Sequence, residues 1–134
     1  MDGVTTGLLW DIFKHIRSWL ANLDRAGESR KLQSIQALRD VITAARETAV
    51  YLRQVKDSGR PNHKTEAHLS VLWTKLGFAL EDLGISKLAK RCQIKGKQWS
   101  DPEHYDADFI SRADISLERM EQLARQILHI VSNR

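Results

Sequence analysis

The sequence contains a single cysteine, Cys92, among its 134 residues. One cysteine cannot form an intramolecular disulfide, and without further cysteines there is no cysteine-rich zinc site. No apolar run approaches the roughly 18 residues that a membrane-spanning helix needs. The N-terminus carries Asp2 rather than a basic cluster, and Asp11 and Lys14 interrupt the apolar residues after Leu8. We therefore expect no signal peptide, no membrane partner and a cytoplasmic location.

The sequence also lacks the motifs of common catalytic and cofactor sites. GxxxxGK(S/T), GxGxxG and GxSxG, which mark phosphate loops, dinucleotide sites and hydrolase nucleophiles, are all missing. His63 and His68 stand in HKTEAH, which is not the HExxH arrangement of metalloproteases. We expect no catalytic site, no cofactor and no metal, so a non-enzyme is favoured.

Two long helical patterns dominate what is present. Apolar residues alternate at intervals of three and four from Ile35 onward, and the C-terminal region repeats this alternation. Such heptads are typical of helices that bury one seam against a partner. We expect the two helices to pack antiparallel. The predicted seams are Leu32, Ile35, Leu38, Ile42, Ala45, Ala49 and Leu52 in residues 29–59, and Ile110, Ala113, Leu117, Met120, Ala124, Ile127 and Val131 near the C-terminus.

Three further helices are predicted between and before these two. Apolar periodicity indicates a first helix from residue 5 or 6 to about residue 24, a third from residue 62 or 65 to about residue 83, and a shorter one from residue 86. The predicted fold class is all-α. It is an antiparallel four-helix bundle with one additional short helix, in a single domain spanning residues 1–134.

Polar residues and glycines mark the expected helix ends. Ser29 and Ser86 are predicted caps, as are Asn62 or Thr65 before the third helix and Asp106 or Asp108 before the last one. Gly59, followed by Pro61, is expected to end the second helix. Gly77 within the third helix indicates either the close approach of another backbone or a local weak point.

Arg39, Arg46 and Arg53 recur every seven residues on the second helix. Guanidinium groups at this spacing can follow a nucleic-acid backbone. They can also pair with Asp114 and Glu121, because both sets fall at heptad position e of two antiparallel helices. The sequence leaves both interpretations open.

Residues 87–108 have the most uneven composition. Five cations lie within residues 87–97, and Trp99 is followed by four acidic residues. Helix dipoles favour such an order without any ligand. The alternative is a recognition loop from Lys95 to Tyr105 with Trp99 as its aromatic anchor. The candidate partner-binding residues are Lys95, Lys97, Trp99, His104 and Tyr105, and the candidate polyanion-binding residues are Arg39, Arg46, Arg53, Lys90 and Arg91.

The net charge of +4 is unevenly distributed. Residues 61–97 hold seven basic and three acidic side chains, whereas residues 98–134 hold four and seven. These charges can satisfy one another within one bundle, so the total charge gives weak support for a polyanionic partner.

The runs ETAVYLRQ, HLSVLWTKLG and LAKRCQIKGKQWSDPEHY resemble a family of small bacterial helical proteins of unknown function, within residues 47–105. This resemblance implies a bacterial source. The predicted bundle also resembles the HEPN ribonucleases at the level of the fold. That family places an Arg and a His, with four to six residues between them, at a dimer cleft. Arg60 and His68 have seven residues between them and Arg125 and His129 have three, so no catalytic residue is transferred.

Three functions fit these patterns. The first is a non-enzymatic helical protein-interaction module, an adaptor or regulator with a protein partner and compatible with a homodimer. The second is a nucleic-acid-binding bundle, which would use the polyanion-binding candidates. The third is a HEPN-like ribonuclease, which ranks last because its motif is incomplete.

Overall fold

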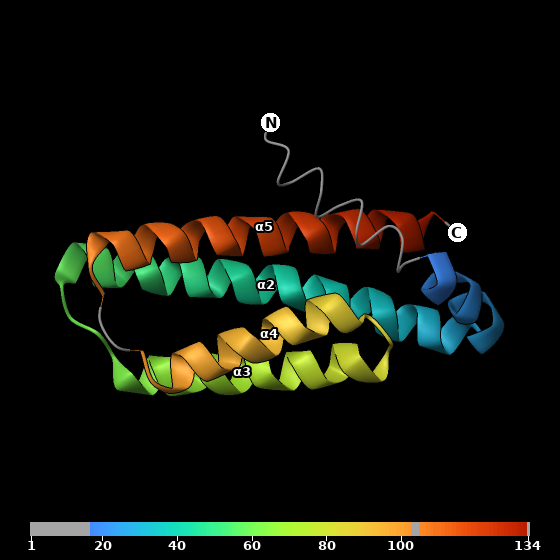
Figure 1. Cartoon of the computed structure of the whole chain (residues 1–134), viewed down its shortest axis with the longest axis horizontal. Helices are drawn as coiled ribbons and strands as arrows, with labels where there is room; N and C mark the ends of the chain where they lie inside the picture. Colours follow the sequence, from blue (N-terminus) through green and yellow to red (C-terminus); the bar gives the residue numbers. More distant parts are fainter. Residues whose placement is uncertain (1–16, 103–104, 134) are drawn as a thin grey trace.

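The computed structural model describes residues 17–102 and 105–133 (Figure 1). Within these ranges the chain is helical without strands: a helix covers residues 17–26, followed by α2 (Glu28–Ser58), α3 (His63–Asp82), α4 (Ser86–Ser100) and α5 (Ala107–Ser132). The predicted all-α bundle with an additional helix is confirmed. The predicted start of the first helix lies outside the described residues. No described helix is both long and apolar enough to cross a membrane.

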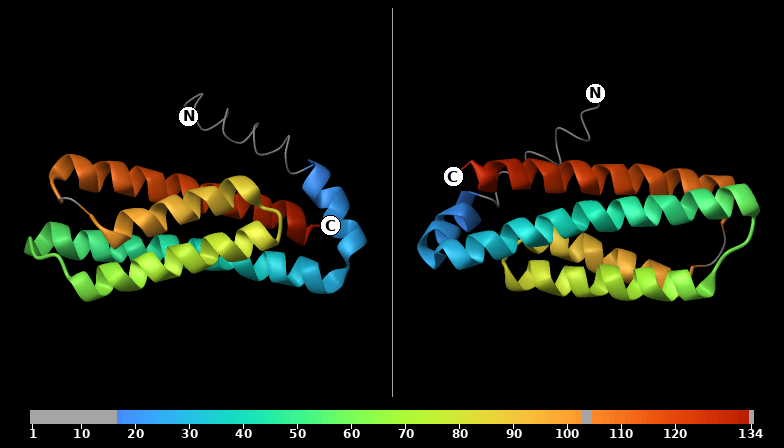
Figure 2. Two further views of the ribbon diagram at one scale, coloured as in Figure 1. Left: turned by 60° about the horizontal axis from the view of Figure 1, so that its bottom comes forward. Right: turned by 180° about the vertical axis from the view of Figure 1, so that it is seen from behind.

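The pairing of α2 with α5 forms one half of the bundle. The two helices lie side by side and run in opposite directions, as both Figure 1 and the right-hand view of Figure 2 show. The predicted antiparallel pairing is therefore confirmed. Most predicted seam positions are buried or half-buried, but Leu32 is 58% exposed. With Ile35 at heptad position a, Leu32 falls at position e beside the arginine row, so it faces solvent.

The hairpin of α3 and α4 forms the other half, and glycines allow its helices to touch. A Cβ on Gly77 would lie 3.1 Å from the carbonyl oxygen of Ala89. A Cβ on Gly96 would lie 2.9 Å from the backbone nitrogen of Thr74. Ser70 Oγ also donates a hydrogen bond to the Gly96 carbonyl, at 2.8 Å. Of the two explanations for Gly77, the close approach of another backbone is confirmed.

Three helix ends use the predicted residues. Asn62 Oδ1 accepts a hydrogen bond from the Thr65 amide at 3.0 Å and so caps α3. Asp106 Oδ1 accepts one from the Phe109 amide at 2.7 Å and caps α5. Gly59 closes α2 in the left-handed conformation, with φ 69°, which glycine adopts without strain.

The predicted caps at Ser29 and Ser86 are wrong. Gly27, with φ 94°, turns the chain so that α2 already begins at Glu28, and Ser29 lies within the first turn. The carboxylate of Glu28 carries the favourable charge at this helix N-terminus. Ser86 is the first residue of α4, and Ile85 occupies the capping position without a side-chain hydrogen bond.

The predicted loop from Lys95 to Tyr105 begins later than expected. α4 extends to Ser100, so residues 95–100 are helical. The helix continues because its buried face continues: Cys92 and Trp99 are seven residues apart on that face, and Gly96 packs on α3. Lys95 and Trp99 therefore have fixed positions on a helix.

Candidate functional site: the α4–α5 groove

α4 packs closely on α3 but approaches α5 much less closely. Two adjoining pockets lie between α4 and α5, and both are lined by Arg112 and Ser116. We call the two pockets together the α4–α5 groove. The outer pocket has a volume of about 270 Å³ and is completed by Arg91, Ile115 and Arg119. The inner cavity has a volume of about 240 Å³ and is completed by Lys95, Gln98 and Trp99 of α4, Phe109, Ala113 and Leu117 of α5, and Thr48 of α2.

The charges along this groove are of one sign. Arg91, Lys95, Arg112 and Arg119 line it, and none of its described lining residues is acidic. Arg112 Nε lies 3.2 Å from Asp108 Oδ2, one turn earlier on α5, but both side chains are largely exposed. An exposed pair of this kind is weak and screened by solvent. The groove therefore carries an excess of positive charge.

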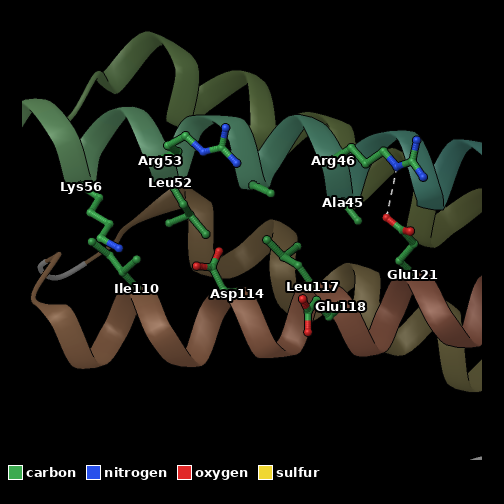
Figure 3. Close-up of a pocket in the computed structure, with 11 residues that line it drawn as sticks. Ala45, Arg46, Leu52, Arg53, Lys56, Ile110, Asp114, Leu117, Glu118 and Glu121 are labelled. Atoms are coloured by element: carbon green, nitrogen blue, oxygen red, sulfur yellow. Dashed lines mark hydrogen bonds and ion pairs between the residues drawn. The ribbon is translucent and has the colours of Figure 1, made fainter.

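The opposite side of α5 has balanced charges. A pocket of about 390 Å³ lies between α2 and α5, and Figure 3 shows the side chains that line it. Arg46 Nε lies 3.3 Å from Glu121 Oε1, and Arg125 Nε lies 3.1 Å from Glu121 Oε2. Burial acts to raise the pKa of Glu121, but hydrogen bonds from the two arginines outweigh it and lower the pKa. The charged lining residues are Arg46, Arg53 and Lys56 against Asp114, Glu118 and Glu121.

The predicted pairing of the arginine row with α5 holds at one position. Arg46 forms the ion pair with Glu121. Arg53 and Asp114 line the same pocket without an ion pair between them (Figure 3). Arg39 is exposed and has no ion-pair partner among the described residues. The row is thus partly used inside the bundle and partly free on its surface.

Lys95 is the most unusual charged residue of the site. It is 7% exposed, whereas Lys90 and Lys97 on the same helix are exposed. Its side chain has no hydrogen-bond or ion-pair partner within the described chain. Burial lowers the pKa of Lys95 and raises the pKa of the Cys92 thiol to about 12. Cys92 is therefore a neutral neighbour and does not balance the charge of Lys95.

Aromatic residues form the wall at the inner end of the groove. Trp99 is 4% exposed and stacks on Tyr105, with ring centroids 6.2 Å apart. Tyr51 and Phe109 meet Trp99 edge to face at 5.7 Å and 6.5 Å. The predicted anchor Trp99 thus packs into the protein's own core, and Tyr105 packs on it. His104 lies outside the described residues.

A buried carboxylate, Glu66, holds this aromatic wall in place. It accepts hydrogen bonds from the hydroxyls of Tyr51, at 3.1 Å, and Tyr105, and His63 Nδ1 lies 2.9 Å from its other oxygen. Burial acts to raise the pKa of Glu66, but these hydrogen bonds outweigh it and lower the pKa. The network fixes residue 105 against α2 and α3, and so fixes where α5 begins.

The structure brings three of the nominated residues to the groove: Arg91, Lys95 and Trp99. It adds Arg112, Ser116 and Arg119 from α5, which the sequence interpretation missed because the C-terminal region is acidic in total. One available signal was the seven-residue spacing of Arg112 and Arg119. It places both on the side of α5 that faces away from Asp114 and Glu121.

No group of three His, Cys, Asp or Glu side chains in residues 17–102 and 105–133 is arranged to hold a metal ion. Comparison of the chain with protein-family models, curated proteins and solved structures finds no match.

Proposed function

We propose that the protein is a non-enzymatic helical interaction module, an adaptor or regulator, that binds an acidic segment of a partner protein in the α4–α5 groove. The observation that supports this proposal is the charge of the groove, which is lined by four cations and by no acidic residue among those described. Complementary charge steers association and suppresses wrong partners. An acidic segment is the protein surface that matches such a groove.

Apolar residues beside the cations favour a helical segment. Ile115 lines the outer pocket and is 47% exposed. Ile94, which is 50% exposed, lies within one turn of Arg91 and of Gln98 on α4. An amphipathic helix binds a groove between helices by placing apolar side chains on such positions. Its acidic side chains would then reach the arginines on both walls.

A synthetic peptide tests this proposal. The probe is a labelled amphipathic helix with glutamates on one face and leucines on the other, and binding is followed by fluorescence anisotropy at low salt. We expect Arg91→Glu combined with Arg119→Glu to weaken binding at least about tenfold, because both charges are reversed where the acidic face would lie. We expect added salt to weaken binding as well, because exposed charges are screened.

The matched control carries Arg39→Glu and Arg60→Glu, which change the net charge by the same amount at exposed sites outside the groove. It should bind the peptide within about twofold of the unchanged protein at moderate salt, where long-range charge effects are screened. Equal losses in both double variants would show that only net charge matters, and the groove would lose its assignment.

Nucleic-acid binding is the second candidate. It is supported by exposed Lys90, which lies next to Arg91 and extends the basic surface along α4. Phosphate contacts release counterions, so the affinity for single-stranded RNA would fall steeply with salt. Base stacking would add little, because Trp99 is buried. If RNA binds at moderate salt more tightly than the peptide, and the groove variants abolish that binding, this candidate replaces the first.

A HEPN-like ribonuclease remains the third candidate. It needs an arginine and a histidine at one cleft, but described His63 and His68 contact the carboxylates of Glu66 and Glu47 and neither lines the groove. RNA should therefore stay intact during incubation with the purified protein. Cleavage that disappears on His63→Ala or His68→Ala would reverse this ranking.

Two further parts of the proposal concern the state of the protein. A cytoplasmic location is favoured because the lone thiol, Cys92, is buried and unpaired, as in a reducing compartment.

A second copy of the chain is the other protein that could occupy the groove. Light scattering tests this homodimer: a mass that doubles with concentration, and falls back in the Arg91→Glu and Arg119→Glu variant, would make self-association the function of the groove.

A further inference from the structure

We propose that the inner cavity of the α4–α5 groove binds a small organic monocarboxylate with an apolar, preferably aromatic, body. This site would take a free small molecule, whereas the peptide would lie along the outer part of the groove. The proposal therefore goes beyond the interaction function and does not depend on it.

The buried lysine is the first reason. Lys95 is 7% exposed and lines the cavity, yet its side chain has no partner in the part of the chain that the structure describes. No fully buried side-chain nitrogen or oxygen among the described residues lacks a partner, so the Lys95 ammonium is open to the cavity while its stem is buried. A carboxylate in the cavity would supply the missing ion pair with a charge-assisted hydrogen bond. The Lys95 ammonium is thus the group that a carboxylate in the cavity would pair with.

Two other donors can complete the recognition of one carboxylate. Ser116 lines the cavity, and its hydroxyl has no hydrogen-bond partner among the described residues. Arg112 stands where the cavity meets the outer pocket and is largely exposed. Thr48 is already satisfied, because its hydroxyl donates to the Ala44 carbonyl at 2.7 Å and accepts from Trp73 Nε1 at 2.9 Å. Its hydroxyl therefore has no proton left to donate to a ligand.

The rest of the lining selects an apolar body. Trp99, Phe109, Ala113 and Leu117 supply apolar surface around the polar groups. A volume of about 240 Å³ corresponds to about eight water molecules at ~30 Å³ each, which suits a molecule of the size of benzoate. One buried ammonium with few further donors matches a single carboxylate better than a phosphate, whose several oxygens need more partners. Sites of this kind are largely apolar with a few placed polar groups.

Titration calorimetry with benzoate tests the proposal directly. We expect saturable binding of benzoate and at least about tenfold weaker binding of benzamide, which has the same shape without the charge. Inorganic phosphate should bind more weakly than benzoate. Benzamide that binds as tightly as benzoate, phosphate that binds more tightly, or no detectable benzoate binding would each overturn the proposal.

Variants assign the binding to Lys95. Lys95→Met keeps a similar length without the charge and should weaken benzoate binding at least about tenfold. Lys97→Met, an exposed control on the same helix, should leave binding unchanged. A thermal melt of each variant confirms that it is folded. If Lys97→Met weakens binding as much as Lys95→Met, the cavity assignment is wrong.

The groove variants separate this inference from the proposed interaction. Arg91 and Arg119 line the outer pocket only. The protein with both residues changed to Glu should therefore lose the acidic peptide and keep benzoate. If the unchanged protein binds the peptide but not benzoate, the cavity is refuted and the interaction function stands. If the double variant keeps both ligands, the groove loses the peptide and the cavity stands.

Discussion

The two sides of α5 face their neighbours in different ways. Towards α2, three cations and three acidic residues line one pocket, and Glu121 accepts from both Arg46 and Arg125. Towards α4, four cations line the groove with no acidic residue among its described lining. The same helix therefore carries a side where charges of the two signs are equal in number and a side where only cations line the groove.

This difference indicates what each side does. On the α2 side the charges balance in number, and the Arg46–Glu121 ion pair supports the register of the two antiparallel helices. On the α4 side, Arg112 makes one exposed ion pair with Asp108, and Lys95 has no partner among the described residues. Because only cations and no acidic residues line the groove, the α4 side is the surface that best matches an anion.

The largest expected change in stability comes from disturbing the contact between α3 and α4. Gly96→Ala should destabilise the protein by about 3 kcal/mol, because a Cβ there would overlap Thr74 Oγ1 and press on the Thr74 backbone. Gly77→Ala should cost less, since its closest contact is the flexible side chain of Gln93. Urea unfolding measures both changes. Equal stability of the Gly96→Ala protein and the parent would contradict the close packing of α4 on α3.

The second prediction is an increase in the stability of the protein. Lys95→Met should stabilise the ligand-free protein by about 1 kcal/mol, because it removes a charge that burial partly desolvates and retains the apolar stem. Lys97→Met, which lies on an exposed site, should change stability by less than about 0.5 kcal/mol. Both are measured by urea unfolding. A destabilised Lys95→Met protein would mean that the charge is satisfied, and the contrast between the two sides would weaken.

The third prediction concerns the network at the inner end of the groove. Because the pKa of Glu66 is lowered in the folded state, its contribution to stability is full above the ordinary pKa of a glutamate and is lost as the pH falls through the lowered value. Unfolding of the parent protein should therefore become easier as the pH falls below the ordinary pKa of a glutamate. Glu66→Gln should flatten this acid dependence and cost about 1 kcal/mol at neutral pH. An unchanged acid dependence would contradict the role of Glu66.

The smallest expected effect lies on the balanced side. Arg46→Glu and Glu121→Arg should each lower stability slightly, and the double change should recover most of the loss, with a coupling of about 0.2–1 kcal/mol. The energy is small because Arg46 is largely exposed. Absence of any recovery would show that this ion pair does not set the register of α2 against α5.

The seam between the long helices could be predicted from the sequence because the heptad pattern encodes which residues face a partner. The same count that placed Arg46 and Glu121 at position e predicted their ion pair, which forms at 3.3 Å. It also explains the miss at Leu32, which precedes the regular alternation and falls on the exposed side. Gly77 was informative because only close packing compensates for a glycine within a helix.

The groove could not be predicted in the same way. Lys95 belongs to a run of cations that is typical of a solvated surface, and only the tight α3–α4 hairpin turns it inward. The total charge of residues 98–134 concealed that Arg112 and Arg119 share one side of α5. Such a site depends on how far two helices stand apart, which a periodic pattern does not encode.

An NMR titration of the isotope-labelled protein with the acidic amphipathic peptide tests the central claim most directly. If the side of α5 that faces α4 is the binding surface, the amide signals that move will come from residues 91–99 of α4 and residues 109–119 of α5, and those of residues 39–53 on α2 will move little. Movement centred on residues 39–53, with the groove signals unchanged, would contradict the account.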